Sequence, residues 1–457
     1  MDPVCSASLG SVHLPIRDRE HSLKRCNSVG IETLKTKRVC GSIESPPNRL
    51  PVPLLLLPLE VLVIVLQYIV EPIGPLKALQ KYGLVSKEWR EILLVNKLWY
   101  RVIVDNEINI SKALKWLCDH KFTVVKEVDF DCWTSEHYQV HATTRVKLMF
   151  ARLQRVQFHY CDLKSVEFFK CFTKLQKLHI SSCDSYIASS SQLFKNSRNS
   201  LTEILFSYAG SSFCQNIIKH NVILTQLNTL DVDKFYYYKK DSISCLQKRC
   251  PNLTTLKLSC CIDKDNSVSR RNLVGFPHLQ HLEVYFQTFN YRGDDSWKND
   301  VMCSLLHSSP QLWSLRIMWY SSSHYEFIPL VSPNLTKLII QSCGCYCVNY
   351  LTKFLSQCTT LKDLHIIRSH YINDQAIDAI ISSPAFASIS CLNVHSTNVT
   401  VEGIKTLLNA DHKLCYLNLL RCQYIPMPAR YVYTKNIIQE FYCDIVTSES
   451  DSDDTDW

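Results

Sequence analysis

The densest run of apolar residues lies between Leu50 and Val70, and its pattern predicts a short buried helix. Pro51, Pro53 and Pro58 break the first half of this run, because each proline removes a backbone donor and clashes with the preceding turn. About 13 helical residues remain after Pro58, roughly 20 Å at about 1.5 Å per residue. A bilayer core is roughly 30 Å thick, so we expect no membrane-spanning segment here.

The helix that begins at Pro58 is apolar on more than one side. One stripe contains Leu62, Val65, Leu66 and Ile69, and a second side contains Val61 and Ile64. A helix that is apolar on two sides must be covered on both. One side can pack on its own domain, and the other implies a partner protein.

Two shorter helices are predicted to follow. "GPLKALQKYG" between Gly74 and Gly83 is the first, and "LVSKEWREILLVNKLW" contains the second. Ser86 is a favourable residue near the start of that last helix. Together the three helices form a small unit, which serves either as a docking domain or as a simple cap on whatever follows it.

From Val125 onward, one pattern recurs: an apolar residue, two residues, a second apolar residue, one residue, and a third apolar residue. The pattern starts at Val125, Leu153, Leu175, Leu201, Leu227, Leu253, Leu279, Leu312, Leu335, Leu361, Ile389 and Leu414. The four consecutive intervals between Leu175 and Leu279 are equal in length. Units this short cannot bury their own apolar side, so they must stack on one another.

Each unit predicts one strand and one helical segment. The second and third apolar residues of the pattern are two apart, so both point inward from a strand. Proline recurs two residues before the pattern at Pro251, Pro277, Pro310 and Pro333, where it ends the preceding helix. The sequence therefore predicts a right-handed α/β solenoid with a parallel sheet on its concave face.

These units resemble leucine-rich repeats. Cysteine stands eight residues after the pattern start at Cys161, Cys183, Cys261, Cys343 and Cys422, which resembles the Cys-containing class of these repeats. "RCPNLTTLKLSCC" from Arg249 is close to the typical unit of that class. The resemblance implies a horseshoe-shaped leucine-rich-repeat domain.

The three helices before the repeats resemble the F-box. The matching residues are Leu57, Pro58, Glu60, Leu62, Ile69, Leu84, Val85, Trp89, Leu98 and Trp99. F-box/leucine-rich-repeat proteins dock on a Skp-type adaptor, which links them to a cullin scaffold. The resemblance implies adaptor contacts at Leu57, Pro58, Val61, Leu62, Val65, Leu66, Ile69, Leu84, Val85, Trp89 and Trp99.

Four segments are expected along the chain. Residues 1–48 lack periodicity and are expected to be disordered, 49–100 to form the F-box, and 101–443 to form about twelve repeats. Residues 444–457 contain six acids and no Lys or Arg, and are expected to form an acidic disordered tail.

The concave face of the repeats is the expected site for a protein substrate. Apolar and aromatic residues gather at its centre, on either side of the long unit between Leu279 and Leu312. The predicted substrate-binding residues are Glu283, Tyr285, Arg316, Met318 and Trp319. Such residues near the middle of a surface are typical of binding hot spots. The alternative left open is that Phe286, Trp319 and Tyr320 pack under the adjoining loop.

Composition adds exclusions. The 457 residues carry a formal net charge of +8 without a dense basic face, which disfavours nucleic-acid binding. The 22 Cys residues follow no secretory signal and suggest reduced thiols in a cytoplasmic or nuclear protein. "CGCYC" with Cys343, Cys345 and Cys347 is the best zinc candidate, but it lacks a fourth ligand. His159, His179, His281, His365 and His395 recur on or beside the strands and are expected to face solvent on the inner curve.

No nucleotide-binding, hydrolase or metalloprotease motif is found, so we expect no catalytic residues, metal or cofactor. The resemblance to F-box/leucine-rich-repeat proteins implies a non-catalytic substrate receptor of an SCF-type ubiquitin ligase, which serves proteasomal degradation. The alternative is a leucine-rich-repeat scaffold or enzyme regulator that uses no cullin. An exposed apolar face around Leu62, Leu66 and Ile69 is expected to distinguish the receptor from the scaffold.

Overall fold

The computed structural model describes residues 58–105, 110–121, 123–131, 144–161, 167–183, 190–207, 221–237, 242–262, 275–287, 305–319, 334–342 and 348–435, with a few single positions between and after them. All of these lie in one compact unit that begins at Leu57. The expectations for residues 1–48 and 444–457 fall outside the described residues.

Four short helical segments open the unit, and we call them the helical head. They are α1 (Leu59–Ile73), α2 (Pro75–Tyr82), α3 (Lys87–Leu93) and the 3-10 segment η2 (Asn96–Trp99). Pro58 precedes α1, where the absence of its N–H costs nothing. The Ser86 hydroxyl caps α3 by accepting a hydrogen bond from the Trp89 backbone N–H at 3.2 Å.

Gly74 joins α1 to α2 with a positive φ of 75°. A Cβ at this position would lie 2.9 Å from the Ile103 Cβ, so a side chain is excluded by space as well as by backbone conformation. The close approach lets α2 pack against the first strand of the sheet. The helical head therefore covers the edge of that strand, which would otherwise present unpaired backbone groups.

The described residues next form a sheet of fourteen strands, whose order in the sheet is their order in the sequence. The strands are β1 (Arg101–Val104), β2 (Glu127–Asp131), β3 (Arg155–His159), β4 (Lys177–Ser181), β5 (Glu203–Ser207), β6 (Thr229–Tyr237), β7 (Thr255–Ile262), β8 (His281–Gln287), β9 (Ser314–Trp319), β10 (Lys337–Gln341), β11 (Asp363–Ile367), β12 (Cys391–Asn393), β13 (Tyr416–Asn418) and β14 (Val432–Thr434). All neighbours pair in parallel except β13 and β14, which are antiparallel.

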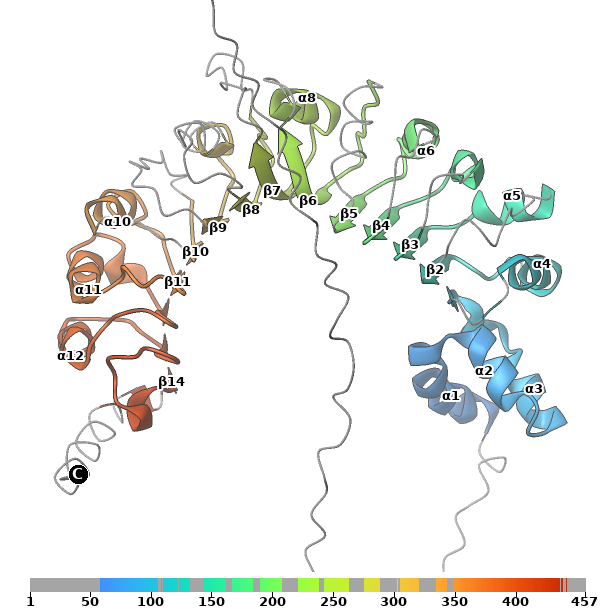
Figure 1. Cartoon of the computed structure of the whole chain (residues 1–457), viewed down its shortest axis with the longest axis horizontal. Coiled ribbons are helices and arrows are strands. Elements are labelled where there is room, and N and C mark those ends of the chain that lie inside the picture. The colour runs from blue at the N-terminus through green and yellow to red at the C-terminus, as the bar shows by residue number, and fades with distance from the viewer. Residues whose placement is uncertain are drawn as a thin grey trace, which may run out of the picture. The chain divides into compact units, whose positions relative to one another are not determined.

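Helical segments return the chain between strands, on the outer side of the curved array, while the strands line its inner side (Figure 1). The described segments are α4 (Ile110–His120), α5 (Thr144–Phe150), η4 (Glu167–Cys171), α6 (Ser190–Ser197), α8 (Ser242–Arg249), α10 (Val348–Leu355), α11 (Asp374–Ile381), η6 (Phe386–Ser388), α12 (Val401–Asn409) and η7 (Met427–Ala429). The predicted leucine-rich-repeat solenoid, with its parallel sheet on the concave face, is confirmed.

Two inward residues of each strand build the core, as the pattern predicts. In β7 these are Leu256 and Leu258, which are buried, while Lys257 between them points to the other side. In β2 the same two positions are occupied by Val128 and Phe130. The Phe130 ring stacks on the Phe158 ring of the next repeat at a centroid distance of 5.2 Å. One continuous core thus runs through the stack.

The cysteine eight residues after the pattern start has a specific role. Its buried thiol lies within hydrogen-bond reach of a carbonyl oxygen of the preceding repeat: Cys161 of Phe130 at 3.4 Å, Cys183 of Phe158 at 3.5 Å, and Cys422 of Val394 at 3.1 Å. Burial raises the pKa of the Cys422 thiol, which favours the protonated form that donates this bond. A small donor at this position adds a hydrogen bond to the carbonyl; at Val394 the Thr397 hydroxyl donates to the same oxygen at 2.7 Å.

Candidate functional site

Helix α1 has one apolar face inside the molecule and another on its surface. Val63, Leu66 and Val70 belong to the core. On the opposite side, Val61, Ile64 and Tyr68 are 40%, 53% and 78% exposed. These three residues, which we call the α1 face, follow the spacing of one side of a helix. Apolar side chains grouped on a surface in this way are typical of an interaction site.

The structure corrects the predicted contact residues on this helix. Leu62 and Leu66 are buried, so neither is available to a partner, and Trp99 is completely buried. Val65, Ile69 and Trp89 are half-buried, and the last two pack against the core. The face predicted around Leu62, Leu66 and Ile69 is therefore not the exposed one, because that stripe packs inside the helical head.

Other predicted contact residues do lie on the surface. Leu84 and Val85, in the turn between α2 and α3, are 86% and 65% exposed. Pro58 and Val61 are also exposed, whereas Leu57 lies outside the described residues. These exposed residues remain predicted adaptor contacts.

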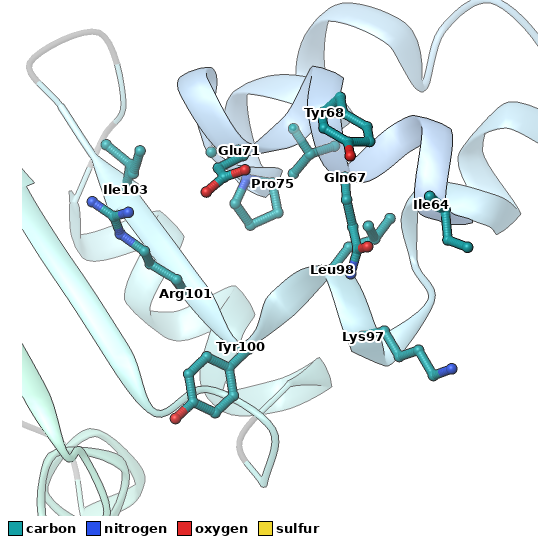
Figure 2. Close-up of a pocket in the computed structure, with 12 residues that line it drawn as sticks. Ile64, Gln67, Tyr68, Glu71, Pro75, Lys97, Leu98, Tyr100, Arg101 and Ile103 are labelled. Carbon is teal, nitrogen blue, oxygen red and sulfur yellow. The ribbon is translucent and has the colours of Figure 1, made fainter. Parts of the chain in front are cut away.

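A pocket of about 420 Å³ opens beside the α1 face (Figure 2). Ile64, Gln67, Tyr68 and Glu71 of α1 line it together with residues of η2 and β1. Its lining is mixed: apolar Leu98 and Ile103, and charged Glu71, Lys97 and Arg101. Because Ile64 and Tyr68 belong to both, the pocket extends the α1 face towards the first strand. Its volume suits one or a few side chains of a partner.

Trp99 joins the helical head to the first repeat. Its ring is fully buried, its Nε1–H donates to the Leu93 carbonyl oxygen at 2.8 Å, and it packs against Trp116 of α4 at a centroid distance of 4.9 Å. The ammonium of Lys121 lies 5.8 Å from the ring centroid and also donates to the Leu94 carbonyl oxygen. These contacts tie the helical head to the repeats at a packed joint.

On the concave face, charges of opposite sign alternate from strand to strand. Asp231, Lys257, Glu283 and Arg316 occupy the same register position in β6 to β9. The Lys257 ammonium lies 3.7 Å from the carboxylate of Asp231 and 3.6 Å from that of Glu283, and Arg316 lies 3.2 Å from Glu283. Arg316 also donates to the Gln341 side chain at 2.8 Å. The centre of this face is thus polar, compensated in charge and held in place by its own contacts.

A second polar network crosses the first strands. The Gln157 amide lies 3.1 Å from the Asp129 carboxylate and 2.7 Å from His179 Nδ1, and His179 Nε2 lies 2.9 Å from Glu203. Arg101 pairs with Asp129, and Lys177 pairs with Glu203 at 2.8 Å. Burial raises the pKa of Glu203, but hydrogen bonds from Lys177 and His179 outweigh it, so the pKa lies below its ordinary value.

The predicted substrate-binding residues differ in how far they are exposed. Glu283 and Arg316 lie on the concave face with partly exposed side chains, and Tyr285 is half-buried beside them. Met318 is only 3% exposed, so its assignment as a contact residue is wrong. Its neighbour Ile317 is also buried, so the alternation of inward and outward residues has ended at this point of β9. The side chain of Trp319 lies outside the described residues.

Four concave-face histidines share one electrostatic feature. Burial lowers the pKa of His179, His281, His365 and His395 below the ordinary value. They are half-buried, and His281 packs edge-on against Trp313 at 4.1 Å, so they face solvent less than expected. Their imidazoles are therefore held in the neutral form at neutral pH.

These pKa shifts predict a loss of stability in mild acid. Because the folded-state pKa values lie below about 6.5, the unfolded chain binds more protons as the pH falls below that value. The stability is thus complete above pH 6.5 and declines as the pH falls towards the folded-state values. We expect the midpoint temperature of thermal unfolding to decrease when the pH is lowered from 7 to 5 at constant ionic strength. The double variant His365→Gln and His395→Gln should show a smaller fall, and a midpoint that rises with acid would contradict the argument.

The described residues contain neither a metal-binding cluster nor a single membrane-spanning helix. Among the described residues, no group of three or more His, Cys, Asp or Glu side chains has a metal-binding arrangement. Cys343, Cys345 and Cys347 lie outside the described residues. In the described part of the chain, no single helix is both long and apolar enough to cross a bilayer; α1 from Val61 and α2 meet those criteria only together, as a pair bent by 108°.

Comparison with known proteins adds one informative relative. No family model matches the chain. An F-box/FBD/LRR-repeat protein of Arabidopsis thaliana is 29% identical over 192 residues, which are 41% of this chain and 39% of that protein. The resemblance to F-box/leucine-rich-repeat proteins is confirmed. The matched part spans about two-fifths of that relative's length.

Two solved structures are similar over about two thirds of this chain. An internalin of Listeria monocytogenes has a TM-score of 0.41 and 14% identity, with 69% of this chain and 89% of that one covered. The yeast Rad7–Elc1 complex contains a chain with a TM-score of 0.39 and 18% identity, with 69% and 77% covered.

Sequence reasoning gave Ile64 and Tyr68 no role in adaptor binding. Ile64 was recognised as lying on a second side of the helix, and Tyr68 continues that side four residues later. Extending the side by the helical spacing would have found the complete α1 face. The ion pairs of the concave face could also have been found, because Asp231, Lys257 and Glu283 recur at the spacing of the repeats.

Proposed function

We propose that this chain is the substrate-recognition subunit of an SCF-type cullin–RING ubiquitin ligase. The helical head docks on a Skp-type adaptor, and the concave face of the repeats binds a protein substrate. The observation that carries the proposal is the α1 face, where Val61, Ile64 and Tyr68 are exposed on a helix whose opposite side is buried. The similarity to an F-box/FBD/LRR-repeat protein supports it.

The adaptor contact is chemically simple. The α1 face supplies apolar area, and the adjoining pocket offers space for a side chain of the adaptor. Leu84 and Val85 add exposed apolar surface on the same helical head. Burying these side chains against a partner is favourable by about 25 cal/mol for each Å² of apolar surface removed from water.

This chain contributes proximity and performs no chemistry in the proposed ligase. A recruited ubiquitin-conjugating enzyme carries out the transfer, and the chain holds the substrate beside it. Holding two reactants together makes a bimolecular transfer effectively intramolecular. The packed joint at Trp99 suits this role, because it limits how far the substrate can move relative to the adaptor.

The concave face suits recognition of a folded or extended protein segment. Its central side chains are already fixed by contacts such as Lys257 with Glu283 and Arg316 with Gln341. Groups that are ordered before binding lose less conformational entropy when a partner arrives. The paired charges also favour a partner whose own charges match the alternation, so they contribute specificity.

The competing proposal is a leucine-rich-repeat scaffold that binds no cullin. In that case the helical head serves only to cover the edge of β1, as it does through Gly74. A cap of this kind gains nothing from the exposed α1 face. The exposure of Ile64 and Tyr68 therefore favours the ligase subunit.

A direct binding measurement tests the proposal. The full chain is immobilised and titrated with a purified Skp-type adaptor, and a cullin is then added with and without the adaptor. We expect adaptor binding with a Kd of about 1 µM or tighter, and cullin capture only when the adaptor is present. If the adaptor does not bind at any reachable concentration, the ligase proposal is wrong and the scaffold remains.

A further inference from the structure

Two arginines follow strands at the end of the parallel array and share one register position, one strand apart. Arg368 follows β11 and Arg421 follows β13, and Ser396 after β12 lies between them in register. The backbone N–H of Arg368 donates to the His395 carbonyl oxygen, and the backbone N–H of Ser396 donates to the Leu420 carbonyl oxygen, both at 2.9 Å. Both arginine side chains are exposed, and within the described part of the chain neither has an ion pair or a side-chain hydrogen bond.

His395 precedes Ser396 and is close enough to both arginines for their charges to act on its imidazole. Its Nδ1 is buried and has no hydrogen-bond partner in the described part of the chain. Burial lowers the pKa of His395, and Arg421 and Arg368 lower it further, with no carboxylate opposing them. The local field is therefore positive, in contrast to the compensated charges at the centre of the concave face.

Two acidic side chains on the neighbouring helices, Asp374 and Glu402, are already engaged. The Asp374 carboxylate accepts hydrogen bonds from the Thr400 backbone N–H at 2.8 Å and from the Thr400 hydroxyl at 2.6 Å. Glu402 pairs with Lys405 at 2.9 Å. These two carboxylates are thus committed elsewhere, and the positive charge of Arg368 and Arg421, beside the neutral His395, is available to an anionic group.

The chain itself carries an acidic segment within reach. Residues 444–457 contain Asp444, Glu449, Asp451, Asp453, Asp454 and Asp456 and no Lys or Arg. This segment follows Phe441, which is buried and packs against Tyr433 of β14 at a centroid distance of 5.6 Å. The point from which the segment departs is therefore fixed beside the last strand.

Distance permits the contact. The two arginines span β11 to β13, so the farther one is three strand spacings, about 14 Å, from β14. Crossing a five-residue strand adds about 17 Å in the perpendicular direction, which gives a separation of roughly 22 Å. Ten residues separate Phe441 from Asp451, and they span up to about 33 Å when extended.

We propose that Arg368 and Arg421 bind the acidic residues of the chain's own segment 444–457. The tether keeps the segment at an effective concentration of millimolar order, so even a weak electrostatic contact is populated. The inference rests on the repeats alone and does not depend on adaptor docking.

Carbodiimide cross-linking of the full chain tests this contact, because the reagent joins a carboxylate to a nearby lysine. Arg368→Lys and Arg421→Lys keep the charge and make each position reactive. Arg198→Lys, at an exposed position after α6, is the matched control. Peptide mapping should find segment 444–457 joined to the first two substituted positions and not to the third.

The expected contact has two further signatures. Raising the salt to 0.5 M shortens the screening length to about 4 Å and should reduce the cross-links at least about fivefold. Replacing Asp451, Asp453 and Asp454 by Asn should reduce them to a similar extent. The arginine substitutions are at exposed positions and the aspartate substitutions are in segment 444–457, so neither set should disturb the core. Circular dichroism of each variant checks that the fold is intact.

Three results would overturn the proposal. One is the absence of cross-links to segment 444–457 when both substituted lysines still react with a soluble acylating reagent. A second is an equal yield at position 198, which would mean random encounters. The third is cross-linking only between molecules, seen as a dimer, which would assign the two arginines to a second copy of the chain.

Discussion

A chain carrying Ile64→Lys is expected to bind a Skp-type adaptor about 100-fold more weakly than the unmodified chain. Ile64 is at the centre of the α1 face and also lines the adjoining pocket, so docking would have to remove the new ammonium from water at an apolar contact. A loss of about 100-fold corresponds to about 2.7 kcal/mol, which is typical of a binding hot spot. Isothermal titration of the two chains with the adaptor measures the difference.

Leu148→Lys is the matched control for this measurement. Leu148 on α5 is 52% exposed and Ile64 is 53% exposed, so both substitutions place a lysine on a comparable surface. Each should change the free energy of unfolding by less than about 0.5 kcal/mol. Equal affinities of the unmodified and Ile64→Lys chains would remove the α1 face from the adaptor site. Equal losses in both lysine variants would show that the effect is not specific.

Trp99→Ala is expected to cause the largest loss of stability. The substitution removes a fully buried ring, at a cost of about 3–5 kcal/mol. It also leaves the Leu93 carbonyl oxygen without its hydrogen bond from Nε1, at a further cost of about 1–3 kcal/mol. Chemical denaturation followed by circular dichroism measures the change in the free energy of unfolding.

Two companions make the Trp99 result interpretable. Trp313→Ala removes a tryptophan that is 38% exposed and should cost less than half as much. Trp99→Phe keeps an aromatic ring but loses the Nε1 donor, so it should fall between Ala and the unmodified chain. If Trp99→Ala unfolds at the same denaturant concentration as the unmodified chain, the joint between the helical head and the first repeat does not depend on this ring.

The repeats were predictable because the same pattern of apolar residues recurs in twelve units. Two inward residues per strand and a proline before several strands repeat at a nearly fixed spacing, so each unit supports the interpretation of the next. The first and last strands, β1 and β14, do not share the pattern and were not predicted. Their residues pack at the ends of the array, where the surroundings differ from those of an internal repeat.

The exposed face of α1 could not be derived from its own sequence. The helix is apolar nearly all round, so periodicity alone does not tell which stripe faces α2 and α3. The structure buries Leu66 and exposes Ile64, whereas the sequence pattern predicts the stripe with Leu66 to be the exposed one. Introducing lysine at Leu62 or Leu66 would therefore damage the fold of the helical head, and a loss of adaptor binding would then have no clear cause.

Met318 shows a similar limit on the concave face. Period-two alternation predicts that it points outward, because Ile317 points inward. Both are buried, since the alternation does not continue to the end of the strand. Glu283 and Arg316, which lie nearer the middle of their strands, follow the alternation and reach the surface.

The antiparallel pairing of β13 with β14 has a consequence for how such a chain can change length. β14 is three residues long and runs opposite to β13, and at the other end of the sheet α2 packs against β1. A new unit appended beyond either end would meet a strand of the wrong polarity or a helix. Duplication or loss of whole units is compatible with this architecture only in its interior, between β2 and β13, where every neighbour offers the same parallel ladder.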